Sequence, residues 1–342
     1  MQAEERFLAA CARRPVDRTP VWMMRQAGRY LPEYRDVRSR VDFLTLCKSP
    51  DLACEVSLQP VTRFGMDACV IFSDILIPVE AMGARLAYTD AGPSLSDPVR
   101  DMAAVDRLEI PDPFAAMPFV MEALRRTREE LHGRAALVGF VGGPFTLASY
   151  LVEGGTSRSL AVLKSLMYSE PATVHALLAK LTDMVAAFAA AQAQEGAQAI
   201  QVFDTWAGDL APDAYGQFAQ PYQRRVLARI RAAGVPSILY VNGCAGRFAS
   251  LAAAGADVIS VDWRVGLAGA RERLGADVAV QGNVDPCILL STPEATRAAA
   301  LDAMKQAGAV GHVLNLGHGV LPATSIECAQ AFCDAPKAMV AA

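Results

Sequence analysis

Eight short runs of apolar residues recur along the chain, separated by longer stretches in which apolar residues return every three or four positions. The runs consist mainly of Val, Ile, Leu, Phe and Ala without strict alternation with polar residues, a pattern typical of parallel strands covered on both faces. The predicted strands occupy residues 21–24, 68–72, 136–141, 199–203, 237–241, 258–261, 278–281 and 312–316.

The stretches between the runs predict amphipathic helices with recognisable ends. Pro171 marks the first turn of one helix, which Gly196 ends, and Pro293 marks another that ends near Gly308. Eight strands alternating with helices favour an α/β fold, a single closed (β/α)8 barrel of the TIM type. A doubly wound open sheet is the alternative, although the chain lacks the Gly-x-Gly-x-x-Gly motif of its dinucleotide-binding forms.

The connection between the second and third runs is too long for a simple crossover. Residues 73–134 contain two groups of turn-forming residues, at 91–93 and 96–98. We therefore expect a small hairpin or lobe appended to the barrel. The length of 342 residues suits one barrel domain spanning residues 1–342.

Composition narrows the class of protein. Hydrophobic residues make up 53% of the chain and charged residues 20%, which suits a large core. The net charge of -4 gives no reason to expect nucleic-acid binding. We expect no membrane span, because the apolar runs are short, and a cytoplasmic location, because the first residues lack the order of a signal peptide.

Cysteine and histidine are scattered in a way that disfavours disulfide frameworks and metal centres. The eight cysteines form no Cys-x-x-Cys pair, and no two of the four histidines lie at ligand spacing, so we expect buried free thiols and no bound metal. None of the five lysines follows a predicted strand, which disfavours a Schiff-base aldolase. The cysteines stand at positions 11, 47, 54, 69, 244, 287, 328 and 333.

Polar residues follow nearly every apolar run, at the end where barrel enzymes hold their active sites. The third run is followed instead by two glycines, which leave space, with Tyr150 shortly beyond. Two arginines after the first run offer planar forks that match carboxylates or phosphates. In chain order the residues gathered at this mouth are Arg25, Arg29, Asp74, Tyr150, Asp204, Thr205, Asn242, Asp262, Asn283, Asp285 and His318.

Each of these residues also has an ordinary structural explanation. The two arginines could form salt bridges, Asp74 could cap the next helix, Tyr150 could be plain core, and His318 could be a hydrogen-bonded structural histidine. The apolar neighbours of Asp74 point instead to a carboxylate in an apolar pocket that faces hydrogen-bond donors or positive charge. We expect Asp262 and Asp285 to be structural.

Short motifs around these residues resemble the uroporphyrinogen decarboxylase family. They appear in the expected order from about residue 6 to about residue 335, which makes the resemblance highly specific. The motifs are MMRQAGRYLPEYR at 23–35, FSDIL at 72–76, GGPFTL at 142–147, Tyr150 with EGG at 153–155, FDTWAG at 203–208, QGNVDP at 281–286 and NLGHG at 315–319.

The resemblance implies a cofactor-independent decarboxylase of porphyrin and haem biosynthesis, acting as a homodimer. Its substrate carries eight carboxylates and four pyrrole N–H groups. Arg25 and Arg29 would meet acetate carboxylates, Asp74 would accept the pyrrole N–H groups, and Tyr150 completes the catalytic set. Substrate binding would also involve Gln26, Ala27, Gly28, Thr205 and His318.

Several questions stay open at this level. The proton donor is undecided, and so are the roles of Asp204, Asp262 and Asp285. Phe43-Leu44 and Asn242-Gly243-Cys244 depart from the usual family pattern, which leaves isomer preference undecided. The rival functions are a zinc- or cobamide-type methyltransferase of the same superfamily, which would need a histidine at position 242, and a non-catalytic tetrapyrrole carrier.

Overall fold

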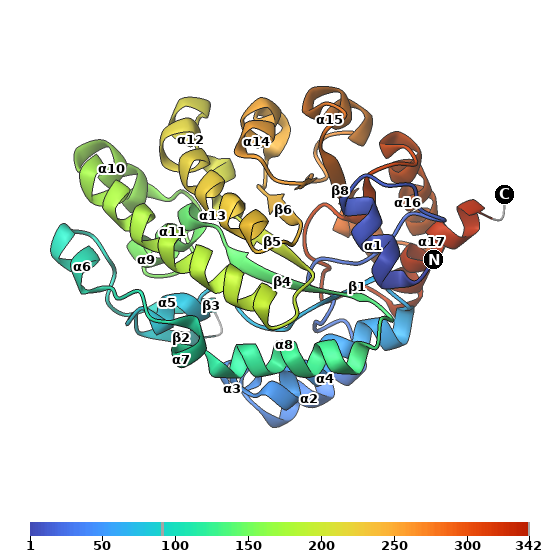
Figure 1. The fold of residues 1–342 in the computed structure, drawn as a ribbon, viewed down its shortest axis with the longest axis horizontal. Coiled ribbons are helices and arrows are strands. Elements are labelled where there is room, and N and C mark those ends of the chain that lie inside the picture. Colours follow the sequence, from blue (N-terminus) through green and yellow to red (C-terminus); the bar gives the residue numbers. More distant parts are fainter. Residues whose placement is uncertain (90–91, 341–342) are drawn as a thin grey trace.

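A computed structural model describes residues 1–89 and 92–340 of the chain. Its centre is a parallel sheet of seven strands, surrounded by helices (Figure 1). Neighbouring strands pair in the order β1 (Ala68–Val70), β4 (Ala136–Gly142), β5 (Ala199–Phe203), β6 (Ser237–Tyr240), β7 (Val258–Ser260), β8 (Ala279–Val284) and β9 (His312–Leu316).

The sheet curls so that its two edges meet a common segment, residues 20–22. Val21 forms a parallel bridge with Leu314 of β9, and the Leu314 N–H donates to Pro20 O at 2.9 Å. On the other side, the Asp67 N–H donates to Val21 O at 2.8 Å, directly before β1. The curled parallel sheet with its covering helices is consistent with a TIM-type α/β barrel.

The strand predicted at residues 21–24 is wrong, since only Val21 pairs as a bridge. The chain leaves the sheet because the Met24 N–H bonds to the side chain of Asn315 and Arg25 adopts a left-handed backbone conformation with φ of 63°. The other seven runs all contain strands, with ends that differ by up to three residues. Every residue of β4, β6, β7, β8 and β9 is buried, as expected of strands covered on both faces.

Helices follow the strands and form the outer layer (Figure 1). The two predicted helix ends are confirmed to within two residues, and Thr292 caps α16 by accepting the Ala295 N–H. The α-helices are α1 (Ala3–Cys11), α2 (Pro32–Arg40), α3 (Phe43–Lys48), α4 (Pro50–Phe64), α5 (Ile77–Ala81), α6 (Met102–Arg107), α7 (Pro113–Ala116), α8 (Pro118–Leu131), α9 (Pro144–Glu153), α10 (Ala161–Ser169), α11 (Pro171–Gln194), α12 (Pro212–Phe218), α13 (Gln220–Ala232), α14 (Phe248–Ala254), α15 (Leu267–Leu274), α16 (Pro293–Ala307) and α17 (Ile326–Val340). Short 3-10 helices η1 (Thr205–Asp209), η2 (Cys244–Gly246) and η3 (Pro286–Leu290) follow β5, β6 and β8.

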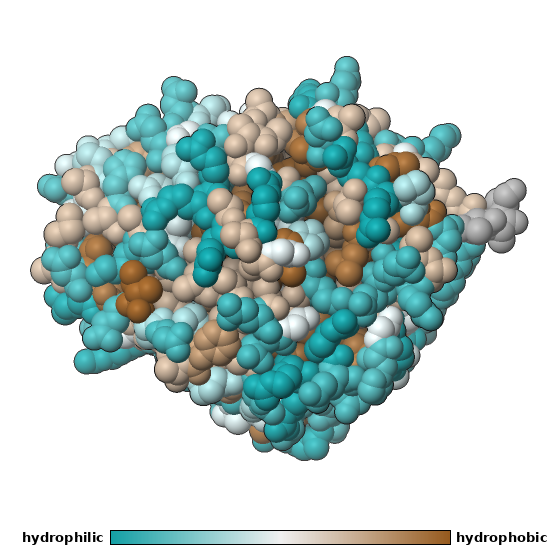
Figure 2. Space-filling view, viewed as in Figure 1, coloured by the Kyte–Doolittle hydropathy of each residue, from teal (hydrophilic) through white to brown (hydrophobic). Residues whose placement is uncertain are grey.

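One helix corrects the expectation that every apolar segment is too short to cross a bilayer. By length and composition alone, α11 is long and apolar enough, with a mean hydropathy of 1.4 over its most apolar window. However, 61% of that window is buried inside the protein, as in a core helix. The face of the molecule seen in Figure 2 is mostly hydrophilic, with apolar residues scattered across it.

The long connection between β1 and β4 contains an antiparallel hairpin. Strands β2 (Leu86–Thr89) and β3 (Gly92–Leu95) pair with Leu86 opposite Leu95, and the Leu95 N–H donates to Gly154 O at the end of α9. The turn predicted at residues 91–93 lies partly outside the described residues, which omit 90–91. The hairpin is thereby attached to α9, which follows the carboxyl end of β4, and it lies beside α5 (Figure 1).

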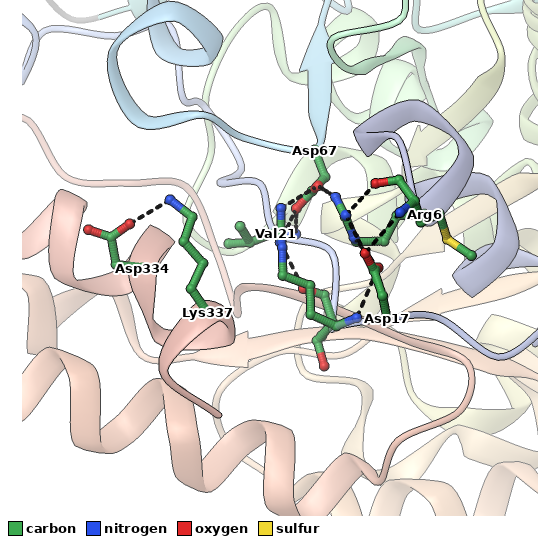
Figure 3. Close-up of polar contacts among 9 residues, drawn as sticks. Arg6, Asp17, Val21, Asp67, Asp334 and Lys337 are labelled. Carbon is green, nitrogen blue, oxygen red and sulfur yellow. Dashed lines mark hydrogen bonds and ion pairs between the residues drawn. The ribbon is translucent and has the colours of Figure 1, made fainter. Parts of the chain in front are cut away.

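Charged residues at the opposite end of the barrel form a closed network (Figure 3). Asp67 is fully buried and accepts from Arg6 at 2.6 Å, from both terminal nitrogens of Arg18 at 2.8 and 2.9 Å, and from the Val21 N–H at 2.9 Å. Arg6 also binds Asp17, whose carboxyl pKa that hydrogen bond holds well below its usual range. The network fastens α1 and the 20–22 segment to β1.

The thiols are free, as expected, but one of them is not buried. Seven of the eight cysteines are buried, whereas Cys287 is exposed in η3.

Candidate active site

The segment after Val21 folds into a tight turn that one buried glutamine holds in place. Gln26 is 1% exposed; its side chain accepts the Met23 N–H at 3.2 Å and donates to Ala68 O at 3.0 Å. The side chain of Gln26 therefore binds the protein's own backbone and faces the core. Within the described structure, the backbone N–H groups of Ala27 and Gly28 donate to no other residue, which leaves them available at the turn.

Arg25 and Arg29 extend from this turn as exposed side chains. Neither guanidinium donates a hydrogen bond or joins an ion pair with any residue that the structure describes. The stem of Arg25 lies over Gly319, where a Cβ would stand 2.3 Å from Arg25 Cδ. Glycine at position 319 thus makes room for Arg25, and both arginines keep free donors for an external anion.

Asp74 follows β1 and is half-buried at the start of the loop to α5. One of its oxygens accepts the Leu76 N–H at 2.8 Å, so the aspartate does cap the local turn. Burial raises the pKa of the Asp74 carboxyl, and hydrogen bonds from Tyr88 and from the Leu76 N–H, with the positive charge of Arg25, oppose that effect. The carboxylate is consequently poorly solvated and favoured by any donor or cation that approaches it.

A tyrosine on the appended hairpin approaches Asp74 and was not expected from the sequence. The Tyr88 ring packs 4.7 Å from that of Phe43, and its hydroxyl is buried next to the carboxylate of Asp74. Burial and the neighbouring carboxylate of Asp74 together raise the pKa of Tyr88. No local sequence pattern marks Tyr88 as a site residue, because it lies on the hairpin rather than after a barrel strand.

Tyr150 and Thr205 stand beside each other at the ends of β4 and β5. Tyr150 lies on α9, half-buried, with its ring edge-on to Trp206 at 6.5 Å, and Thr205 begins η1. Burial raises the pKa of Tyr150, to which Asp74 also contributes. Tyr150 is therefore a neutral hydroxyl at physiological pH, close enough to Asp74 and Arg25 to feel both charges.

Asp204 lies beneath this pair as a fully buried anchor. Its carboxylate accepts from Thr146 N and Oγ1, both at 2.8 Å, and from Gln223 Nε2 at 2.7 Å. A Cβ at Gly143 would stand 2.2 Å from Asp204 Cγ, so only glycine fits there. With both oxygens occupied by protein donors, Asp204 positions α9 and η1 and does not face the mouth.

His318 reaches into the mouth from the loop after β9. Its Nδ1 accepts the Gly319 N–H at 2.8 Å, and its ring lies edge-on to those of Tyr240 and Trp263. Burial, reinforced by the charges of Arg25 and Arg264, lowers the pKa of His318 to about 4. The ring is therefore neutral near pH 7, and since Nδ1 is an acceptor, Nε2 carries the proton and is a donor.

The remaining strand ends supply supports. Asp262 is buried and accepts the Cys244 and Arg264 N–H groups at 2.8 and 2.9 Å. Asp285 caps η3 by accepting the Cys287 N–H at 2.9 Å. Asn283 is 9% exposed and donates to two backbone carbonyls. These contacts are structural.

The structure brings most, but not all, of the predicted residues together. The charge of Arg25 acts on Asp74, Tyr150 and His318, and that of Asp74 acts on Tyr150. Arg29 lies on the same turn as Arg25, and its charge acts on Tyr34. Arg264 also reaches this end of the barrel, after β7, although it was not among the residues singled out from the sequence. The mouth thus combines guanidiniums that are free within the described residues, one poorly solvated carboxylate and neutral donors.

Comparison with protein families and curated proteins gives a consistent result. A model of the family "Uroporphyrinogen decarboxylase (URO-D)" matches residues 2–339. The chain is 48% identical over 331 residues to the uroporphyrinogen decarboxylase of Myxococcus xanthus (strain DK1622), covering 97% of the chain and 95% of that relative. It is 49% identical over 329 residues to that of Syntrophotalea carbinolica (strain DSM 2380 / NBRC 103641 / GraBd1), covering 96% of both.

Solved structures support the fold. A methyltransferase from Methanosarcina mazei superposes with a TM-score of 0.85 and 22% identity, covering 99% of both chains. A B12-independent methionine synthase from Shewanella sp. W3-18-1 gives a TM-score of 0.57 at 14% identity, covering 85% of this chain and 86% of the other. At these identities the likeness concerns the barrel and not the chemistry.

Proposed function

The chain belongs to the uroporphyrinogen decarboxylase family and is a carboxy-lyase, and we propose that the mouth of its barrel removes the four acetate carboxylates of uroporphyrinogen III to give coproporphyrinogen III. The observation that carries the proposed site is the pair of guanidiniums, Arg25 and Arg29, that have no partner in the described part of the chain, near the poorly solvated carboxylate of Asp74.

The proposed receptor matches the charges of the substrate. The acetate carboxylates bind the forks of Arg25 and Arg29 and the free N–H groups of the turn between them. The four pyrrole N–H groups, which point to the centre of the macrocycle, donate to Asp74. Thr205 and the Nε2–H of His318 offer neutral donors to the remaining polar groups.

The proposed chemistry begins with protonation of a pyrrole carbon, which makes the ring an iminium-like cation. The electrons of the breaking C–CO₂⁻ bond flow into this cation and carbon dioxide leaves. A proton then adds to the side-chain carbon and the ring proton is lost, so each acetate becomes a methyl group. Asp74 stabilises the cation most strongly when its charge is fully developed, which is transition-state stabilisation. Tyr150 lies beside this carboxylate and helps to hold the ring.

We propose that the reaction needs no metal or organic cofactor, because the substrate ring itself accepts the electrons. This separates the proposal from the methyltransferase alternative. At the place of that enzyme's histidine this chain has Asn242, and Cys244 has a pKa raised by burial to about 12, so it remains a thiol. Decarboxylation that survives exhaustive chelation supports the proposal; activity lost on chelation and restored by zinc contradicts it.

We also propose one catalytic domain that acts as a cytoplasmic homodimer. The support is the full-length family match and the resemblance on which the dimer was expected. Sedimentation at micromolar concentration measures the assembly, and a purely monomeric species would contradict it.

The deciding experiment is anaerobic incubation with uroporphyrinogen III, following the number of carboxylates on the product by chromatography. A decarboxylase gives successive products with seven, six, five and finally four carboxylates. A non-catalytic carrier binds the macrocycle and returns all eight carboxylates unchanged. The same assay on Asp74→Asn tests whether this carboxylate is required.

A further inference from the structure

A third guanidinium, Arg264, stands at the mouth on the wall opposite Asp74. Round the ring formed by the 20–22 segment and the seven strands, β7 lies four places from β1. Arg264 follows β7, whereas Asp74 follows β1. A macrocycle whose pyrrole N–H groups converge on Asp74 carries its carboxylates around that residue, so one of its edges lies toward β7 and Arg264.

The side chain of Arg264 is held in one orientation. Its Cζ lies 3.9 Å from the centroid of the Trp263 ring, and its Nη1 donates to Asn242 Oδ1 at 2.9 Å and to Asp262 Oδ1 at 3.3 Å. The Trp263 ring in turn lies edge-on to His318 at 6.1 Å. Arg264 is thus fixed relative to a residue already placed in the site, with little rotamer freedom left to lose on binding.

The rest of the guanidinium is unused. Nε and Nη2 donate to no residue within the described ranges, and the side chain is 47% exposed. These two nitrogens form the edge that binds a carboxylate through two parallel hydrogen bonds. The buried Asp262 does not need the guanidinium, because it already accepts the Cys244 and Arg264 N–H groups.

From this geometry we infer that Arg264 is a substrate-binding residue, which receives a carboxylate on the edge of the tetrapyrrole that lies toward β7. The inference rests on the proposed function for the identity of the ligand. We assign Arg264 a role in binding and not in the chemical step, because its free nitrogens suit a carboxylate of the substrate. Eight carboxylates need more than the two arginines of the 25–29 turn, and Arg264 supplies the next fixed fork.

The test compares Arg264→Gln and Arg264→Lys with the wild-type protein. Arg264→Gln should raise KM for uroporphyrinogen III about tenfold with kcat nearly unchanged, because a charge-assisted bidentate contact made in both ground and transition states is lost. Arg264→Lys keeps the charge without the fork and should fall between the two. Since the Asp262–Arg264 contact is partly exposed, Arg264→Gln should melt within a few degrees of wild type.

Arg225→Gln is the matched control. Arg225 lies on α13, has a similar exposure of 50% and pairs with Asp183 in the outer helical layer. This variant should leave KM and kcat unchanged. A purely structural Arg264 would instead lower the melting temperature and leave KM as it is, and that outcome overturns the inference; a fall in kcat at unchanged KM overturns it as well.

A binding measurement separates this inference from the proposed function. The oxidised, coloured form of the octacarboxylic macrocycle binds without reacting, so its Kd can be followed by visible absorption. Weaker binding by Arg264→Gln supports Arg264 as a carboxylate receptor even if the wild-type protein performs no decarboxylation. Equal binding by both proteins, alongside normal turnover by wild type, rejects the role of Arg264 and leaves the proposed function intact.

Discussion

The two ends of β1 carry aspartates in opposite situations. Asp67 precedes the strand, is fully buried and is surrounded by donors from Arg6, Arg18 and Val21 (Figure 3). Asp74 follows the strand by four residues and accepts a backbone N–H, while Arg25 stays unpaired nearby. Both ends combine aspartate with arginine. Among the described residues, only the end opposite the mouth, around Asp67, completes its ion pairs within the protein.

The difference between the two aspartates indicates which end of the barrel contributes to stability and which end is suited to binding. A buried carboxylate whose oxygens are all satisfied contributes to the fold and has nothing left for a ligand. A poorly solvated carboxylate beside unpaired arginines is costly for the free protein, and a substrate with complementary charge relieves that cost. The pairing of the charges, and not the residue types, therefore distinguishes the structural end from the active end.

The largest effect is expected on the stability of the protein, from a substitution of Asp67 at the end of the barrel opposite the mouth. Asp67→Asn leaves Arg18 without a counter-charge and Arg6 with Asp17 alone, so the free energy of unfolding should fall by about 3 kcal/mol, measured by denaturant titration. Asp277→Asn is the control, because Asp277 is 99% exposed and its contact with Arg13 should contribute less than about 1 kcal/mol. Equal effects of the two substitutions would contradict a stabilising role for the buried network.

The second prediction concerns Asp74→Asn, which keeps the size and an acceptor oxygen but removes the charge. The loss of charge stabilisation should lower kcat by about 10²–10³ with a smaller effect on KM. Asp285→Asn is the control, because Asp285 makes a similar backbone cap after β8. Near wild-type kcat for Asp74→Asn would make Asp74 a structural cap.

Asp74→Asn should lower kcat but increase the stability of the folded protein. Because burial raises the pKa of Asp74 above its unfolded value, the folded state holds the proton more tightly, and stability falls as pH rises through the folded pKa. At neutral pH the ionised Asp74 thus destabilises the fold, and Asp74→Asn should raise the melting temperature slightly. A lower melting temperature for Asp74→Asn, as expected for Asp67→Asn, would mean that both aspartates stabilise the fold.

The third prediction concerns Arg29→Lys, which keeps the charge and removes the bidentate fork. KM for uroporphyrinogen should rise about tenfold because hydrogen bonds to the substrate carboxylate are lost. Arg40→Lys, in the exposed pair with Asp36 on α2, should leave KM unchanged. An unchanged KM for Arg29→Lys would remove Arg29 from the receptor.

The smallest effect is expected at His318. The pKa of about 4 keeps this ring neutral near pH 7, so His318→Gln, which retains a neutral donor, should raise KM only about threefold. The shape of the rate profile between pH 6 and 8 should be unchanged, measured from kcat/KM. A rate that rises as His318 titrates in that range would show that its charged form takes part.

The pattern of apolar residues along the chain is enough to locate seven of the strands and the residues that follow them. Continuous apolar runs identify strands buried on both faces, and a parallel barrel places everything after those strands at one mouth. Asp74, Tyr150 and Thr205 could therefore be located before any coordinates, and motifs in fixed order indicated the family. The spacing of apolar residues reflects which positions of a segment are buried, and the positions of the strands follow from that burial.

Only the tertiary structure decided which charges are paired and which side chains face inward. The contact between Arg6 and Asp67 spans 61 positions of sequence, so no local pattern distinguishes these partners from the unpaired Arg25 and Arg29. Gln26 turns into the core, Tyr88 reaches Asp74 from a separate hairpin, and the fork of Arg264 is fixed by Asn242 and Asp262. Hydrogen bonds and ion pairs are short-ranged, and folding alone brings their distant partners within reach.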